Sequence, residues 1–420
     1  MSYFILADCN NFYVSCERLL NPKLDKKPII ILSNNDGCVV SRSQEAKDLG
    51  IKMGDVYFKI RDYCERAKVI VYSSNYALYG DISRRVMSIL TSFSPEAEIY
   101  SIDEAFLKYP HMPPEDILSI ALDLRKTVKR WTGIPICLGI GPTKTLAKVA
   151  NDLAKKKKLY ALDLSAEGIR QELFKGYEVG EVWGIGSRLA QRLNALGIYT
   201  VAQLIAEDSL LIRKKLGVIG ERLQYELQGI ACSDLEKATV KKSITRSRCF
   251  GRSLSEETEI AEALASFAAD GCVALREQKS CARAITVFLE ITPEKGEQFQ
   301  RLQLSQHALL DMPTNDTSAI IKAAKECLKN IYRPHLRYRK CGIIFLDLLH
   351  EEDRIPDLFI PVNPKRKILM ETMDEINNTF GKESLFLASM GVHPVWKGKK
   401  QFHSHYNTTD WGQLPTASAL

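Results

Sequence analysis

Two short apolar runs of this chain lead into carboxylates, and this pattern constrains the fold more than any other feature. Residues 3–7 precede Asp8, and the run from Ile99 to Leu107 contains the adjacent pair Asp103 and Glu104. Apolar runs of this length are typical of buried strands, so one sheet could bring the three acids together. Crowded carboxylates repel each other and raise each other's pKa values unless a cation lies between them.

The three acids are therefore candidate ligands for a hard, oxygen-seeking cation. Mg²⁺ binds one or two carboxylates together with substrate phosphates. Two such ions roughly 3.5–4 Å apart drive phosphoryl and nucleotidyl transfer by in-line displacement. The simpler alternative is that Asp103 and Glu104 form a strand-to-turn corner while Asp8 caps a helix. Each acid taken singly favours that alternative, and the residues around them reverse the preference.

The composition excludes several classes of protein. At 420 residues the chain is long enough for roughly two to four domains. It is 45% hydrophobic and 26% charged, as in globular proteins, and its net charge of +7 permits a polyanionic partner. Its 11 cysteines include no Cys-x-x-Cys pair, which indicates free thiols in a reducing cytoplasm. No run approaches the roughly 20 apolar residues of a membrane span, and the first residues lack the features of a signal peptide.

The pattern along the chain predicts an α+β protein of several domains. Residues 1–167 read as mixed α/β and include a hairpin at 28–41, and residues 168–238 read as mostly helical. Residues 239–350 predict a small α+β module, and residues 351–420 a polar tail. The module's expected strands are Ser243–Phe250, Ala282–Ile291, Phe299–Leu304 and Cys341–Leu349, and its expected helices are Glu256–Glu277 and Ser318–Ile331.

Two aromatic residues lie close to the first carboxylate. Tyr13 is five residues past Asp8, near the start of an expected helix. If a triphosphate lies over Asp8, a ring at this position lies under the sugar and clashes with a ribose 2′-hydroxyl. The alternative is that Phe12 and Tyr13 are core aromatics, and for Phe12 the two interpretations are balanced.

Cations and a helix start provide a candidate phosphate site. Arg42, Gln44 and Lys47 flank and line the helix that follows the hairpin, and a helix N-terminus with nearby cations binds phosphate. A solvated helix face is the alternative. Three lysines of a later helical segment share one face that could reach a triphosphate or a DNA backbone: Lys144, Lys148 and Lys155.

A glycine turn between two expected helices is a candidate contact for a nucleic-acid backbone. Gly184 and Gly186 precede Arg188, so the backbone N–H groups of the second helix could hold a phosphate without reading sequence. A plain helix–helix turn with a glycine cap is the alternative. Residues 216–222 contain a degenerate second copy of the motif.

Two basic strands extend this candidate interface. Arg246, Arg248 and Arg252 share parity and therefore one sheet face, and a second cluster contains Arg337 and Arg339. Like charges on one sheet face repel each other unless a polyanion lies across them. A DNA duplex, bound in a salt-sensitive manner, is the expected partner.

At this point the whole chain resembles the Y-family translesion DNA polymerases, and within them the UmuC branch. The matching stretches run from residue 4 to about 350 in the family's order and spacing. They are residues 8–17, 32–40, 45–47, 50–55, 72–81, 100–106, 143–148 and 182–186.

The resemblance implies a right-hand polymerase. Its palm would lie within residues 1–167, with small fingers inserted at about 12–75. A helical thumb with a helix-hairpin-helix would cover residues 168–238, and an α+β little-finger domain would cover 239–350. Residues 351–420 would form a C-terminal interaction tail.

The resemblance also assigns roles to single residues. Asp8, Asp103 and Glu104 would be catalytic and would hold two dNTP-linked Mg²⁺ ions with the backbone carbonyl of Cys9. Tyr13 would be the gate that excludes ribonucleotides. The triphosphate would lie against Gln44, Lys47 and Lys155, although some members of the family carry Tyr and Arg at the positions of Gln44 and Lys47.

The implied activity is error-prone, template-directed addition of dNTPs opposite damaged bases. The implied partners are primer–template DNA, a processed UmuD dimer and RecA, in the bacterial cytoplasm at the nucleoid. Leu358 and Phe359 lie where the family carries a sliding-clamp peptide, without its leading Gln. Two other functions stay open from the residues alone, a non-catalytic DNA scaffold and a metal-dependent nuclease.

Overall fold

The computed structural model describes residues 2–236, 240–292, 302–355, 364–404, 408 and 412. The chain divides into two compact units. The first contains residues 1–33, 37–237 and 401–420, and the second contains residues 34–36 and 238–400. Within the described residues no helix is both long and apolar enough to cross a membrane.

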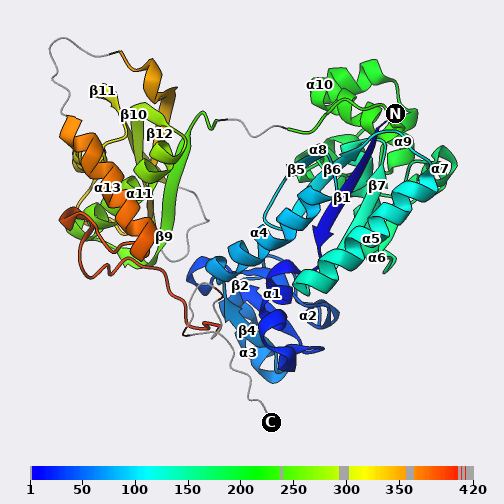
Figure 1. The fold of residues 1–420 in the computed structure, drawn as a ribbon, viewed down its shortest axis with the longest axis horizontal. Coiled ribbons are helices and arrows are strands. Elements are labelled where there is room, and N and C mark those ends of the chain that lie inside the picture. The colour runs from blue at the N-terminus through cyan, green and yellow to red at the C-terminus, as the bar shows by residue number, and fades with distance from the viewer. Residues whose placement is uncertain are drawn as a thin grey trace. The chain divides into compact units, whose positions relative to one another are not determined.

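A five-stranded sheet forms the centre of the first unit (Figure 1). Its order is β5 (Glu96–Ile99), β6 (Glu104–Tyr109), β1 (Tyr3–Cys9), β7 (Ile136–Gly141) and β8 (Ala161–Asp163). In β1, Ile5 and Ala7 pack into the core with helices α4 (Tyr76–Ser92) and α5 (Pro114–Thr132), while Phe4 and Leu6 contact Phe106 and Ala147 on the other face. Both faces of β1 are covered, which explains its unbroken apolar run.

Helix α6 (Lys144–Lys156) lies against β7 at unusually short range. A Cβ atom built on Gly139 would lie 2.0 Å from the carbonyl oxygen of Ala147 and 2.4 Å from the nitrogen of Asn151. Only glycine allows this approach. The close contact carries the lysines of α6 toward the carboxyl end of β1.

A smaller three-stranded sheet forms a second part of this unit (Figure 1). Its order is β3 (Val39–Arg42), β2 (Ile29–Leu32) and β4 (Ile70–Ser73), with β2 antiparallel to β3 and parallel to β4. The hairpin expected at 28–41 is present, although the parallel partner β4 did not emerge from the sequence. The accompanying helices are α1 (Phe12–Leu20), the 3-10 turn η1 (Pro22–Leu24), α2 (Gln44–Asp48) and α3 (Tyr57–Arg66).

The helical part expected after residue 167 is present. It comprises α7 (Glu167–Phe174), the 3-10 turn η3 (Val179–Glu181), α8 (Ser187–Asn194), α9 (Val201–Ala206) and α10 (Ser209–Gln228). Its core includes Phe174, Leu193 and Leu227, and it continues into Leu146 and Val149 of α6.

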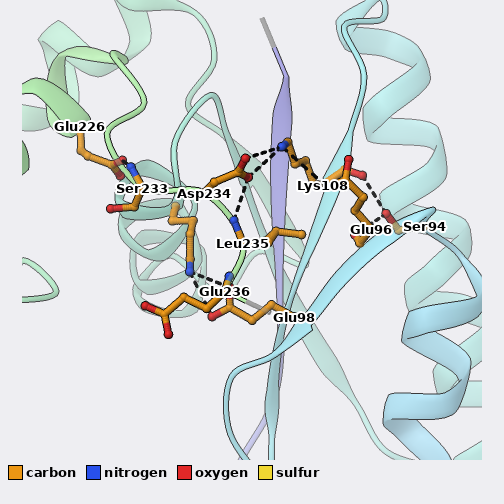
Figure 2. Close-up of polar contacts among 10 residues, drawn as sticks. Ser94, Glu96, Glu98, Lys108, Glu226, Ser233, Asp234, Leu235 and Glu236 are labelled. Atoms are coloured by element: carbon orange, nitrogen blue, oxygen red, sulfur yellow. Dashed lines mark hydrogen bonds and ion pairs between the residues drawn. The ribbon is translucent and has the colours of Figure 1, made fainter. Parts of the chain in front are cut away.

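The segment after α10 lies across the central sheet and is held there by polar contacts (Figure 2). Asp234 Oδ1 is 2.7 Å from Lys108 Nζ, and the backbone N–H of Glu236 donates to Glu98 Oε2 at 2.6 Å. Glu98 also pairs with Lys144 Nζ at 2.7 Å, and both of these side chains are buried. A buried ion pair therefore anchors the segment that follows α10 at Glu236.

The second unit contains a four-stranded antiparallel sheet of order β11 (Gln303–Thr314), β10 (Ser280–Ile291), β12 (Tyr338–His350) and β9 (Ile244–Leu254). Helices α11 (Glu257–Glu277) and α12 (Thr317–Ile331) cover one face. The α+β module expected from the sequence is thus present, with one correction. The strand expected at Phe299–Leu304 runs instead from Gln303 to Thr314, and residues 293–301 lie outside the described part.

The polar tail expected after residue 350 contains more structure than its composition indicated. It includes the 3-10 turns η4 (Glu351–Asp353) and η5 (Ala388–Met390) and the helix α13 (Pro364–Phe380). Arg276 of α11 pairs with Asp374 of α13 at 2.5 Å. Leu358 and Phe359 lie outside the described residues.

Candidate active site

The strand register places two of the expected carboxylates side by side. In the antiparallel pair β1–β6, Asp8 lies directly opposite Glu104. Directly opposite residues project from the same face of a sheet with Cβ atoms about 4.5–5.5 Å apart. Asp8 is 8% exposed. The first expected run forms β1, but the run from Ile99 to Leu107 is divided between β5 and β6, with Asp103 in the turn between them and Glu104 at the start of β6.

Asp103 lies beside this pair through its backbone. The N–H of Cys9 donates to the carbonyl of Asp103 at 2.9 Å, while the Asp103 carboxylate accepts from the hydroxyl of Ser101 at 2.7 Å. Within the described residues, no three His, Cys, Asp or Glu side chains have the spacing of a preformed metal site. The third acid is therefore next to the other two without closing a ligand cage.

Two lysines of α6 neutralise the acid pair. Lys155 Nζ is 2.5 Å from Asp8 Oδ1, and Lys148 Nζ pairs with Glu104. Burial raises the pKa of Asp8 to about 7, against the opposing charge of Lys155. Burial acts on Glu104 in the same direction, but hydrogen bonds from Asp8 and Lys148 outweigh it and lower the pKa of Glu104. Buried beside Glu104, Asp8 thus binds its proton more tightly than a free carboxyl does, and a divalent cation would relieve this crowding of acids.

The expectation for the lysine face of α6 needs one correction. Lys148 and Lys155 reach the acids, but Lys144 is buried against Glu98 and cannot reach a phosphate in solvent. Lys148 also lies over the rings of Tyr100 (4.5 Å) and Trp183 (5.7 Å). The sequence spacing of four and seven placed these lysines on one face without distinguishing a buried role from an exposed one.

Cations from β3 and α2 gather near Asp8. Arg42 ends β3, and within the described residues its buried Nε and Nη1 atoms have no hydrogen-bond partner. Burial lowers the pKa of Lys47, and the charges of Arg42 and Lys155 lower it further. Gln44, at the start of α2, instead donates its amide to Asp48 at 2.8 Å. Arg42, Lys47 and Lys155 thus repel one another, as expected for a site that awaits an anion.

The two aromatic residues of α1 have different environments. Phe12 is 3% exposed and belongs to the core, which favours the core interpretation for this residue. Tyr13 is half-buried and stacks on Tyr79, with ring centroids 4.4 Å apart and planes 13° apart. Tyr76 meets Tyr13 edge-on at 6.2 Å. The ring of Tyr13 therefore remains accessible to a ligand, whereas the ring of Tyr79 is buried.

A buried carboxylate lies behind this aromatic group. Glu17 is 3% exposed and accepts a hydrogen bond from the hydroxyl of Tyr79 at 2.7 Å. Burial raises the pKa of Glu17 from 4.5 to about 7, although hydrogen bonds from Tyr79 and Ser404 oppose the rise.

The raised pKa of Glu17 predicts that the stability of the folded protein depends on pH. A carboxyl with a raised folded-state pKa binds its proton more tightly when folded, so its contribution to stability falls as pH rises from about 4.5 to about 7. Glu17→Gln should therefore stabilise the protein by about 2–3 kcal/mol more at pH 8 than at pH 5. Thermal unfolding at both pH values tests this, and an equal effect at the two would contradict it. Cys16 and Tyr79 also face Glu17, but both stay neutral over this range because burial raises their pKa values.

The glycine turn has the backbone expected of a helix-hairpin-helix in its second half. Gly184 has φ +93°, Gly186 is the N-cap of α8, and Arg188 is exposed on that helix. The first helix is reduced to the 3-10 turn Val179–Glu181. The degenerate second copy of the motif, residues 216–222, lies within α10, and this helix is kinked at Gly217, which has φ +76°.

The basic strands differ from the sequence expectation in their surroundings. Arg246 and Arg248 lie opposite the buried Ile343 and Cys341 of β12, which places them on the helix-covered face of the sheet. Arg248 is 3.9 Å from Asp270 of α11. Both arginines line a cavity of about 600 Å³ between α11 and α13. The parity of Arg246 and Arg248 predicted that they share one face of the sheet, but not that the helices cover this face.

The premise of unpaired like charges is also wrong for most of this group. Arg252 pairs with Glu259 at 2.6 Å, and Arg339 pairs with Glu290 at 2.7 Å. Arg337 is exposed. The acids that neutralise these arginines lie on other elements, so the strand sequence alone could not reveal them.

The fold is that of the Y-family DNA polymerases. The chain matches a Y-family polymerase chimera of Dbh and Dpo4 over 83% of its own length and 99% of that chain, with a TM-score of 0.67 and 21% identity. DinB from Sulfolobus solfataricus matches over the same shares with a TM-score of 0.53 and 21% identity. The right-hand polymerase fold expected from the sequence is confirmed.

The sequence comparisons narrow this class. Residues 7–152 match the impB/mucB/samB family, residues 241–358 match the C-terminal domain of that family, and residues 367–417 match a domain of unknown function. Protein ImpB of Salmonella typhimurium is 40% identical over 99% of both chains. Protein UmuC of Salmonella typhimurium is 38% identical over 98% of this chain and 99% of its own. The chain belongs to the impB/mucB/samB family, and the expected kinship with the UmuC branch is confirmed.

Proposed function

We infer that this chain is a DNA-directed DNA polymerase that copies damaged templates with low fidelity. The observation that carries this inference is the pairing of the buried Asp8 with the half-buried Glu104, held at adjacent strand positions within a Y-family fold. The family membership supports the same activity, because relatives at 37–40% identity include UmuC and MucB, and more distant relatives are named DNA polymerase IV.

The donor set fits divalent magnesium. Asp8 and Glu104 are adjacent hard oxygen ligands, and Asp103 with the carbonyl of Cys9 would complete the set. When bound, two Mg²⁺ ions would lower the pKa of the primer 3′-hydroxyl and neutralise charge on the triphosphate. Lys148 and Lys155, paired with the acids here, would then be released toward the phosphates.

The incoming nucleotide would be held from the fingers side. Arg42 has unpartnered donors among the described residues, and together with Lys47 and Lys155 it forms a cation group that a triphosphate would neutralise. Gln44 is less well placed, since its amide already binds Asp48. Tyr13 would lie under the sugar and exclude a 2′-hydroxyl.

Primer–template DNA would be held through its backbone. The N–H groups at Gly184 and Gly186 and the exposed Arg188 provide a sequence-independent phosphate contact. Arg246, Arg248, Arg252, Arg337 and Arg339 would add positive charge from the second unit, with part of that charge offset by the paired acids.

The proposed partners follow from the likeness to UmuC-type proteins. We expect a processed UmuD dimer and RecA to assist the enzyme at the bacterial nucleoid in the cytoplasm. We also expect a sliding clamp to engage Leu358 and Phe359. Primer extension across a damaged template, with and without these partners, tests this. Template-dependent extension identifies a polymerase, degradation without dNTPs identifies a nuclease, and binding alone identifies a scaffold.

The role of Tyr13 has its own test. Tyr13→Ala should lower the preference for deoxynucleotides over ribonucleotides, measured as a ratio of kcat/KM values, by on the order of 10²-fold because the clash with the 2′-hydroxyl is removed. Tyr63→Ala on α3 is the matched control, since the Tyr63 hydroxyl binds the carbonyl of Leu49 within the fingers. An unchanged ratio in Tyr13→Ala would remove the gate role.

A further inference from the structure

A polar network lies directly behind the ring of Tyr13. Tyr79 of α4 stacks on that ring at 4.4 Å and donates its hydroxyl to Glu17 of α1 at 2.7 Å. Tyr79 is fully buried and Glu17 nearly so. Burying a carboxyl carries a cost that hydrogen bonds must offset. The contact orients Tyr79, and Tyr79 in turn supports the ring of Tyr13.

A third member of the network comes from the far end of the chain. The hydroxyl of Ser404 donates to Glu17 and accepts from Asn75 Nδ2 at 2.8 Å. Asn75 is the N-cap of α4 and accepts from the N–H of Leu78 at 3.3 Å. The network therefore joins α1, the start of α4 and the C-terminal segment.

The C-terminal segment is anchored on both sides of Ser404. The N–H of Ser73 in β4 donates to the carbonyl of Phe402 at 2.7 Å, and the N–H of Phe402 donates to the Ser73 hydroxyl at 3.1 Å. The Phe402 ring meets Tyr57 edge-on at 5.5 Å. Thr408 donates to Asp81 at 2.7 Å. Residues 401–420 belong to the same compact unit as Tyr13, so these contacts lie within one body.

We propose that Tyr79, Glu17 and Ser404 are positioning residues that hold the Tyr13 ring in place, so that the C-terminal segment helps this enzyme to reject ribonucleotides. The proposal rests on the proposed role of Tyr13. A stacked ring can slide along its partner, and a small displacement would relieve the clash with a 2′-hydroxyl. The hydrogen bond to Glu17 fixes the position of Tyr79, and a fixed Tyr79 prevents that displacement of the Tyr13 ring.

The test is the ratio of kcat/KM for a dNTP to that for the matching rNTP, in the full-length protein on primed DNA. Tyr79→Phe, Glu17→Leu and Ser404→Ala should each lower the ratio by about fivefold, the equivalent of one hydrogen bond. Glu17→Gln and Ser404→Thr keep the acceptor and the hydroxyl and should restore the ratio. Thr408→Ala removes a contact of the same segment outside the network and should leave the ratio unchanged.

Combination with Tyr13→Ala separates the possible outcomes. If Tyr79 acts through the ring, Tyr79→Phe should add nothing once Tyr13 is alanine, whereas a further fivefold loss would overturn the proposal. If Tyr13→Ala lowers the ratio but Tyr79→Phe, Glu17→Leu and Ser404→Ala do not, the network is structural only and the gate stands. If Tyr13→Ala itself has no effect, the gate role fails with it. Ser404→Ala, at a half-buried position, keeps the test available if a core variant does not fold.

Discussion

Asp8→Asn should reduce primer extension by at least about 10³-fold. Asp8 lies opposite Glu104 on adjacent strands and is the more buried of the two acids. Stabilising the charge of the reacting phosphate and oxygen contributes several kcal/mol to such transfers, and each 1.36 kcal/mol corresponds to about a tenfold change in rate. Asparagine keeps the size of the side chain but removes its charge. Single-turnover extension of a labelled primer with saturating dNTP measures the effect.

The control for Asp8→Asn is a second acid of the same unit. Asp123→Asn on α5 removes an exposed carboxylate that pairs with Lys126 at 3.5 Å, so extension should stay close to that of the unchanged protein. Thermal unfolding of both variants checks that the sheet is intact. Extension by Asp8→Asn at the rate of the Asp123→Asn control would contradict the assignment of the acid pair as the reaction centre.

Lys144→Ala should lower the free energy of unfolding by about 3–5 kcal/mol, because it leaves a buried carboxylate without its cation. The side chains of Lys144 and Glu98 are 4% and 8% exposed, and Glu98 also receives the N–H of Glu236. Removing one partner therefore costs far more than the pair contributes net. A urea titration followed by circular dichroism measures the loss.

A neighbouring ion pair provides the matched control. Lys108 pairs with Asp234, which is 68% exposed, so Lys108→Ala should cost less than about 1 kcal/mol (Figure 2). The double variant Glu98→Leu with Lys144→Met should recover most of the loss, since it removes both charges. Equal losses for Lys144→Ala and Lys108→Ala would show that burial does not govern the strength of this pair.

The sequence predicted elements whose pattern is local. The alternation and length of the apolar runs gave β1, β9, β10 and β12, and the periodicity of α11 and α12 placed both helices within one residue at each end. Pairing between strands that are distant in the sequence was harder to predict. The parallel contact between β2 and β4 depends on residues 41 positions apart, such as Ile29 and Ile70, and nothing within either strand specifies the other.

The candidate site likewise contains some features that the sequence predicted and others that it could not predict. The positions of Asp8 and Glu104 followed from strand ends, but the ion pairs with Lys155 and Lys148 depend on how closely α6 approaches the sheet. For the arginines of β9, parity gave a shared face. It could not say which face the helices cover, nor that Asp270 and Glu259 of α11 would neutralise Arg248 and Arg252.

The bare backbone at Gly139 has a consequence for adaptation of the enzyme. Because α6 packs directly on the bare backbone of β7 there, any larger residue at position 139 would push the helix, and the lysines that it carries, away from the carboxylates. The contact between α6 and β7 therefore admits no larger side chain at this position.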